Sequence, residues 1–260
     1  DFNVGPSSNA EMERMIETYR DKGIFISVTG FGMGNYKDDK MEIIADKGNG
    51  NYNYIDNLME AKKVFVNEFG STLYTIAKDV KIQIEFNPAY VKEYRLVGYE
   101  NRLLNAEDFE NDKKDAGEMG AGHSVTALYE IVPANREGET GRQLKYQKTE
   151  VQPSASETRE LATIQFRYKK PDGTRSILME KTVSSAVVPN AGTSDNFRFS
   201  AAVAGFGMLL RNSEFKGTLN YENVIEMARN ARGRDADGYR AEFIRLAELS
   251  SEQLALREEE

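Results

Sequence analysis

The sequence predicts an α/β plus β fold: a partial parallel α/β sheet, then an antiparallel β-sandwich, then C-terminal helices. Three patterns predict these parts. Residues 24–29 are apolar almost without alternation, as in a strand that is covered on both faces. From residue 80 onward apolar and charged residues alternate, which is typical of antiparallel strands with one solvated face. After Pro189, helix caps and helical spacing return.

The first part of the chain, residues 1–78, alternates helices with strands. Ser8 or Asn9 caps the first helix, and Gly23 ends it. Short connections between a helix, a strand, a helix, a strand and a long helix indicate a parallel α/β unit. The predicted elements are 9–22, 24–29, 38–45, 51–55 and 57–78.

The second part, residues 79–190, is predicted to form the β-sandwich. In its first strand Val80, Ile82 and Ile84 alternate with Lys81 and other polar residues, so we expect the apolar side to be buried and the polar side to be solvated. A Pro-Asp-Gly turn at 171–173 predicts a hairpin between the last two strands. The expected strands are 80–86, 93–101, 123–132, 160–169 and 175–184, with long loops at 106–121 and 134–158.

The last part, residues 191–260, is predicted to be a helical segment. Asn196 and Asn220 are expected to cap two of its helices, and apolar residues at helical spacing mark a third. The expected helices are 196–211, 220–231 and 236–248.

Composition excludes several classes of function. The chain contains 34 lysines and arginines against 42 aspartates and glutamates, a net charge of −8, so binding to nucleic acid is not expected. It has no cysteine, which excludes disulfides, thiolate zinc sites and thiol catalysis. His123 is the only histidine and excludes a multi-histidine metal site. No apolar run approaches the roughly 20 residues that span a bilayer.

A glycine loop follows the first predicted strand. Gly30, Gly32 and Gly34 match neither the dinucleotide-binding nor the P-loop pattern, so a tight turn is the simpler interpretation. Open α/β sheets bind ligands at the carboxyl ends of their strands, where this loop is expected to lie. Candidate ligand-face residues are therefore those of the loop and of the start of the chain: Asp1, Asn3, Gly32, Gly34 and Asn35.

Other chemistry-bearing residues have structural explanations. His123, alone and without a motif, is expected to be structural or exposed. Asp235 and Asp237, followed by Gly238, resemble the start of an EF-hand, but Ile244 stands where that loop requires glutamate. The two acids are instead expected to favour the start of a helix. No catalytic residues are predicted, and an enzyme is not expected.

Several long stretches carry a family resemblance. Those in the first part resemble the C-terminal half of a bacterial von Willebrand factor type A domain: DFNVG at 1–5, IFISVTGFGMGN at 24–35 and ADKGNGNYNYIDNLMEAKKVF at 45–65. The later part is similar to the uncharacterised C-terminal domain that follows this type A domain in one bacterial subfamily. Its stretches are VKIQIEFNP at 80–88, EYRLVGYENRLL at 93–104 and GHSVTALYEI at 122–131. The resemblance implies a domain boundary between residues 78 and 79.

The resemblance implies that part of the type A domain is missing. Intact domains often bind Mg²⁺ or another divalent ion, but the ligands would precede Asp1, so no metal ligand and no cofactor is assigned to this chain. The strand at 24–29 would also lack a neighbour and leave an open edge. We expect a partner to cover this edge: the missing half, a second copy of the chain, or the sandwich domain.

The resemblance also carries the expected function. It implies a non-enzymatic protein-interaction or adhesion module of a bacterial cell-envelope protein, with an unknown protein partner. Two alternatives stay open. One is a hydrolase with an unrecognised site in the β domain. The other is an assembly factor for an envelope complex, which would need a large exposed apolar surface on the helices at 196–248.

Overall fold

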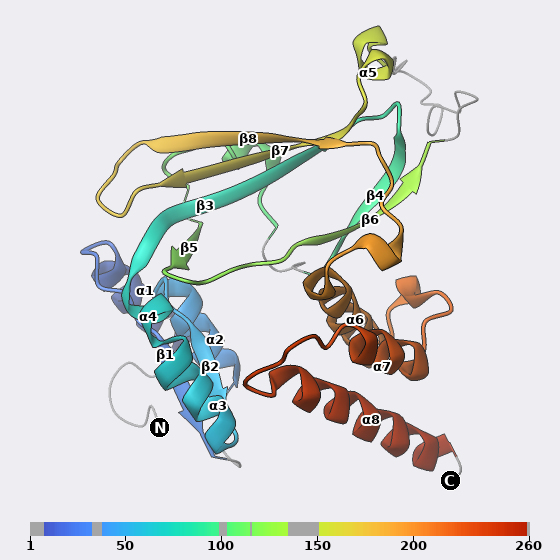
Figure 1. Cartoon of the computed structure of the whole chain (residues 1–260). Coiled ribbons are helices and arrows are strands. Elements are labelled where there is room, and N and C mark those ends of the chain that lie inside the picture. The colour runs from blue at the N-terminus through green and yellow to red at the C-terminus, as the bar shows by residue number, and fades with distance from the viewer. Residues whose placement is uncertain (1–7, 33–37, 99–102, 115, 135–150, 259–260) are drawn as a thin grey trace. The chain divides into compact units, whose positions relative to one another are not determined.

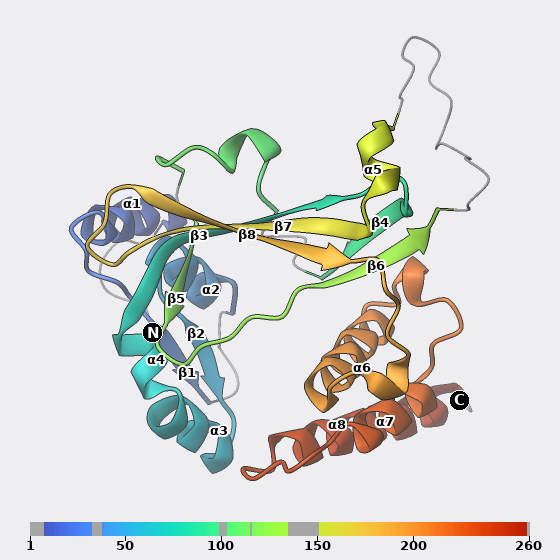
Figure 2. The ribbon, with the colours of Figure 1, turned by 45° about the horizontal axis from the view of Figure 1, so that its top comes forward.

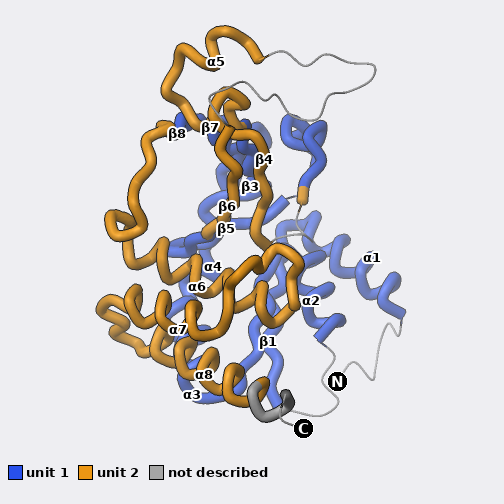
Figure 3. The backbone as a smooth tube through the Cα atoms, turned by 90° about the vertical axis from the view of Figure 1, so that its right-hand side faces the viewer, with its two compact units in different colours: residues 1–85, 104–125, 163–183 blue, residues 86–103, 126–162, 184–260 orange. Residues whose placement is uncertain are grey.

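The computed structural model is a mixed helix and sheet structure with several separate sheets (Figure 1). The chain divides into two compact units (Figure 3). Unit 1 comprises residues 1–85, 104–125 and 163–183, and unit 2 comprises 86–103, 126–162 and 184–260. The predicted boundary between residues 78 and 79 stays a prediction. The structure describes residues 8–32, 38–98, 103–114, 116–134 and 151–258.

Unit 1 begins with the predicted order of helices and strands. Strands β1 and β2 pair in parallel, from Val28 opposite Tyr52 to Phe31 opposite Ile55. Met12 and Ile16 of the first helix pack against Ile44 of the second, which gives this layer its core. The elements are α1 (Asn9–Arg20), β1 (Val28–Phe31), α2 (Asp38–Lys47) and β2 (Tyr52–Ile55).

The long helix predicted over 57–78 is interrupted and ends early. Gly70, Ser71 and Thr72 have low helix propensity, and the aromatic and β-branched residues at 74–76 favour an extended strand. A strand therefore begins at Thr75, inside the predicted helix. The observed elements are α3 (Leu58–Lys62), a π-helix (Lys63–Asn67), α4 (Phe69–Leu73) and β3 (Thr75–Phe86).

Strand β3 belongs to a four-stranded sheet with the order β5-β3-β7-β8 (Figures 1 and 2). A turn closed by the Gly173 N–H and the Lys170 carbonyl joins β7 and β8, as the Pro-Asp-Gly motif predicts. The sequence missed β5 and a 3₁₀ helix, which lie in the loop expected at 106–121. The β-sandwich stays a prediction. The new elements are the 3₁₀ helix (Ala106–Asp108), β5 (Gly117–Gly120), β7 (Glu160–Lys169) and β8 (Ser176–Ser184).

The burial of two neighbouring residues of β3 is the reverse of what the alternation predicts. Lys81, expected on the solvated side, is only 4% exposed. Ile82, expected in the core, is 48% exposed. The physical reason is that residues 104–114 cover the charged side of the sheet, where side chains of the strands bind their backbone.

Unit 2 contains a two-stranded antiparallel ribbon and a helical part. The ribbon packs its aromatic rings together, with Phe86 4.4 Å from Tyr94 and 5.5 Å from Tyr129, centroid to centroid. Arg95 pairs with Glu130 across the ribbon and lies over the ring of Phe215. The elements are β4 (Val91–Val97), β6 (Leu128–Pro133), α5 (Pro153–Glu157) and the 3₁₀ helices Asn190–Gly192 and Glu214–Lys216.

Three helices complete unit 2: α6 (Asp195–Leu210), α7 (Tyr221–Asn230) and α8 (Tyr239–Glu258). Their core joins Ala202, Ala228 and Ile244, one residue from each helix. Asn220 caps α7 as predicted, but Ser194 rather than Asn196 caps α6. None of the helices in the described part of the chain has the length and apolar character that crossing a membrane requires.

Candidate functional site

Of the five residues predicted to lie on the ligand-binding side of the sheet, the structure describes one. Gly32 follows β1 with φ of +83°, a conformation that favours glycine, so the tight-turn interpretation agrees with the backbone. The Tyr54 hydroxyl donates to the Gly32 carbonyl at 2.8 Å and fixes the start of the loop. The other four candidates, Asp1, Asn3, Gly34 and Asn35, lie outside the described residues.

An aromatic pair adjoins this loop. Phe31, the last residue of β1, is 62% exposed, and its ring stacks on that of Phe65 at 6.4 Å with an interplanar angle of 9°. Phe65 is itself 46% exposed. Large apolar rings at a strand end are suited to contact with another protein, because their burial removes much apolar surface from water.

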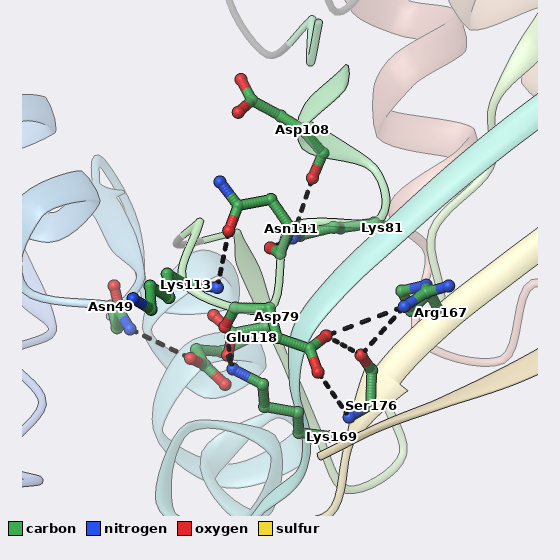
Figure 4. Close-up of polar contacts among 11 residues, drawn as sticks. Asn49, Asp79, Lys81, Asp108, Asn111, Lys113, Glu118, Arg167, Lys169 and Ser176 are labelled. Carbon is green, nitrogen blue, oxygen red and sulfur yellow. Dashed lines mark hydrogen bonds and ion pairs between the residues drawn. The ribbon is translucent and has the colours of Figure 1, made fainter. Parts of the chain in front are cut away.

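A cluster of polar side chains lies on the side of the four-stranded sheet that residues 104–114 cover (Figure 4). We call it the charged clamp; it consists of Asp79, Lys81, Asp112, Arg167, Lys169 and Ser176. The Lys81 amine donates to the backbone carbonyls of Asp108 and Asn111, at 3.1 and 2.6 Å. Burial lowers the pKa of this amine, and the nearby carboxylates only partly offset that effect.

Lys169 also binds residues of the clamp and of the covering segment 104–114. Its amine donates to the Asp79 carboxylate at 2.7 Å and to the Asp112 carbonyl at 2.6 Å. Both partners of the ion pair are largely buried, so solvent screens it less than a surface pair. Lys169 thus ties the segment that contains Asp112 to strands β3 and β7.

Asp112 connects the covering segment to strands β7 and β8 through its side chain. Its carboxylate accepts hydrogen bonds from the hydroxyl and the backbone N–H of Ser176, and the Arg167 guanidinium lies 3.8 Å away. These contacts, the Ser176 hydroxyl first, lower the pKa of Asp112. Arg167 also lies over the buried ring of Phe109, 5.5 Å from its centroid.

The described contacts of the clamp are internal to unit 1. Its three cations bind carboxylates, a hydroxyl or backbone carbonyls of unit 1, and its serine faces a carboxylate whose lowered pKa makes it a weak base. Nothing in the sequence analysis singled out these residues. The available signal was a charged or amide side chain on every second residue over parts of β3 and β7, which ordinarily indicates a solvated face.

The remaining sequence candidates supply no metal site. In the described ranges no three histidine, cysteine or acidic side chains lie close enough together to bind a metal ion. His123 is exposed after β5. The Asp235 carboxylate accepts from the backbone N–H groups of Arg240 and Ala241, which confirms its expected place at a helix start.

Comparison with known proteins assigns the family. Residues 71–253 match a family model described as "Uncharacterized protein YfbK, C-terminal". The chain belongs to this YfbK C-terminal family. An uncharacterised YfbK protein of Escherichia coli K12 is 44% identical over 250 residues, which is 96% of this chain and 43% of the relative. The chain therefore spans less than half of the curated relative that it matches.

The comparison with solved structures gives a weak match. A crystal structure of the ArnB paralog VWA2 from Sulfolobus acidocaldarius aligns with 82% of this chain and 49% of its own. The sequence identity is 9% and the TM-score is 0.38. The assignment to the YfbK C-terminal family rests on the family match alone.

Proposed function

We propose that this chain is a non-enzymatic protein-interaction module, and that its first 78 residues are the C-terminal half of a type A domain in a bacterial cell-envelope protein. The observation that carries the proposal is the exposed stacked pair Phe31–Phe65, next to Gly32. In open α/β sheets the carboxyl ends of the strands are the ligand-binding side. Exposed aromatic rings there favour a protein partner over a small charged ligand.

The parallel pairing of β1 and β2 agrees with this proposal. Among the described strands β1 has only β2 as its neighbour, so its outer edge offers unpaired backbone groups. In the longer protein a strand of the same domain would pair with this edge. Any Mg²⁺-dependent contact would then be supplied by residues that this chain does not contain.

Partner binding tests the proposal most simply in a longer protein that includes the rest of the proposed type A domain. Partners captured with magnesium and with a chelator would be identified, purified and titrated against it. Phe31→Ser is expected to weaken binding at least about tenfold, because it removes a central aromatic contact. Phe69→Ser is the matched control: Phe69 is also about half exposed but lies on α4, and its substitution should change affinity by less than about twofold. No binding with or without magnesium, or equal effects of the two substitutions, would refute the proposal.

One observation favours the alternative that the chain is an assembly factor for an envelope complex. Apolar side chains on the helical segment of unit 2 are exposed: Phe197, Val203, Leu210, Phe215 and Leu246. A surface of this kind can hold partly folded clients. Light scattering from a heat-aggregating client enzyme would test it. If the chain suppresses aggregation of the client and a Val203→Lys/Leu210→Lys variant does not, the result supports this function. If the natural chain does not suppress aggregation, the result contradicts it.

A further inference from the structure

The four-stranded sheet binds the backbone of the covering segment, residues 104–114. Lys81 of β3 and Lys169 of β7 donate to three carbonyl groups of the segment at 2.6 to 3.1 Å, those of Asp108, Asn111 and Asp112. Every polypeptide offers carbonyl groups, so the two amines can donate to a different segment in the same way. All of these contacts lie within unit 1 (Figure 4).

A group of donors beside these two amines binds a carboxylate. The Asp112 carboxylate accepts from the hydroxyl and the backbone N–H of Ser176, and Nη1 of Arg167 lies 3.8 Å from it. A hydroxyl, a backbone N–H and a guanidinium are together suited to a negatively charged group with two oxygen atoms. The sheet therefore recognises a backbone with an acidic side chain at one position.

Asp112 does not use all of these donors. A guanidinium binds a carboxylate most strongly through two parallel hydrogen bonds of about 2.7–2.9 Å, and the contact of 3.8 Å is too long to be one of them. Nε of Arg167 is buried and has no hydrogen-bond partner among the residues that the structure describes. An unpaired buried donor is unfavourable. A ligand whose carboxylate reached this nitrogen would gain a hydrogen bond that the covering segment does not make.

We propose that the charged clamp is a binding site for an acidic polypeptide segment of a partner, and that the covering segment occupies this site as an internal competitor. The covering segment has the charge that the site accepts, with acidic residues at 107, 108, 110 and 112. Because it is tethered, it competes at an effective concentration on the order of millimolar. A partner displaces it by pairing the guanidinium more completely than Asp112 does.

A labelled peptide that copies residues 104–114 tests the proposal by fluorescence polarisation with the full chain. Asp112→Ala removes the carboxylate of the internal competitor and keeps the donors of the sheet. The variant should bind the peptide at least about tenfold more tightly than the natural chain, because the site is free in a larger fraction of molecules. An absence of binding to the variant at up to about 200 μM peptide would overturn the proposal.

Glu110→Ala is the matched control for this substitution. It removes the same charge from an exposed residue of the same segment, and should change the affinity for the peptide by less than about twofold. Asp112→Asn, which is closer in shape to the natural residue, should also tighten binding. Circular dichroism would verify the fold of each variant. Equal affinities of the Glu110→Ala and Asp112→Ala chains would contradict the competition.

Further measurements in the Asp112→Ala chain identify the chemistry that the site recognises. A peptide with asparagine in place of Asp112 should bind at least about tenfold more weakly, because it brings no carboxylate to Arg167. Arg167→Gln should weaken binding of the original peptide by a similar factor, and Arg175→Gln, which removes the same charge from an exposed neighbour of Ser176, by less than about twofold. Displacement of the peptide by millimolar inorganic phosphate would assign the site to phosphate groups and overturn the proposal.

This inference does not depend on the proposed function. The charged clamp does not include Phe31 or Phe65, so Phe31→Ser should leave binding of the peptide unchanged. Loss of partner binding with unchanged peptide binding, or the reverse, shows which of the two proposals fails.

Discussion

Gly120 shows how one residue fixes the end of the four-stranded sheet. A Cβ added there would lie 1.7 Å from the Ser71 carbonyl oxygen, a backbone atom that can move only with α4. Gly120→Ala is therefore expected to lower the free energy of unfolding by about 1–3 kcal/mol. Urea denaturation would measure the loss.

Gly117, in the same strand, is the control for this prediction. A Cβ there would meet no atom within 4 Å, so Gly117→Ala should change the stability by less than about 0.5 kcal/mol. If both alanine variants were equally stable, the close approach of β5 to α4 would be disproved.

Individual residues also show what the sequence could predict. The helix-start role of Asp235 and the cap at Asn220 were predictable, because capping depends on residues only a few positions away. The burial of Lys81 could not be predicted in this way. It depends on carbonyl groups of Asp108 and Asn111, 27 and 30 positions further along the chain. The alternation of apolar and polar residues shows which residues share a side of the strand. It does not show which side another segment covers.

At the scale of elements, the charged clamp fastens residues 104–114 to the sheet. Lys169→Gln removes the cation that binds both Asp79 and the Asp112 carbonyl. Amide hydrogen exchange in residues 105–114 should become about tenfold faster, which corresponds to a loss of about 1.4 kcal/mol. Lys170→Gln, in the neighbouring turn, should leave exchange unchanged. Equal exchange in the two variants would show that Phe109, not the clamp, holds the segment.

The clamp also predicts a dependence of stability on pH. The pKa of Lys81 is lowered in the folded chain and lies near 10.5 in the unfolded chain. Between these two values the unfolded state binds more protons, so the stability of the fold should rise with pH through this window. Lys81→Met lacks the titrating amine. Denaturation at a series of pH values from 8 upward should show a rise in the natural chain relative to this variant.

The Lys81→Met variant has a second expected effect. It removes the amine that donates hydrogen bonds to two backbone carbonyl groups in a partly buried site, which should cost about 1–3 kcal/mol at neutral pH. Lys170→Met, in the neighbouring turn, is the control for both measurements. Parallel stability curves for the natural chain and Lys81→Met would contradict the lowered pKa.

At the scale of the whole molecule, the stretches at 80–131 that resemble a known C-terminal domain predicted the family of this part of the chain better than patterns predicted the architecture. Sequence similarity reports common descent and does not depend on knowing which surfaces meet. The two-residue and helical periodicities located most strands and helices. The end of the predicted helix over 57–78 could not be found from periodicity alone, because Leu73 and Ile76 continue the helical spacing of apolar residues into the strand that begins at Thr75.

The edge of β1 with which no described strand pairs is the feature on which the account of the molecule depends most. Amide hydrogen exchange of Val28–Phe31 would test it directly, in this chain and in a longer protein with the rest of the predicted type A domain. The β1 amides that do not bond to β2 should exchange rapidly in this chain and at least about tenfold more slowly in the longer protein, because a neighbouring strand would then pair with them. Equal exchange rates in the two proteins would contradict the proposal that β1 belongs to an incomplete sheet.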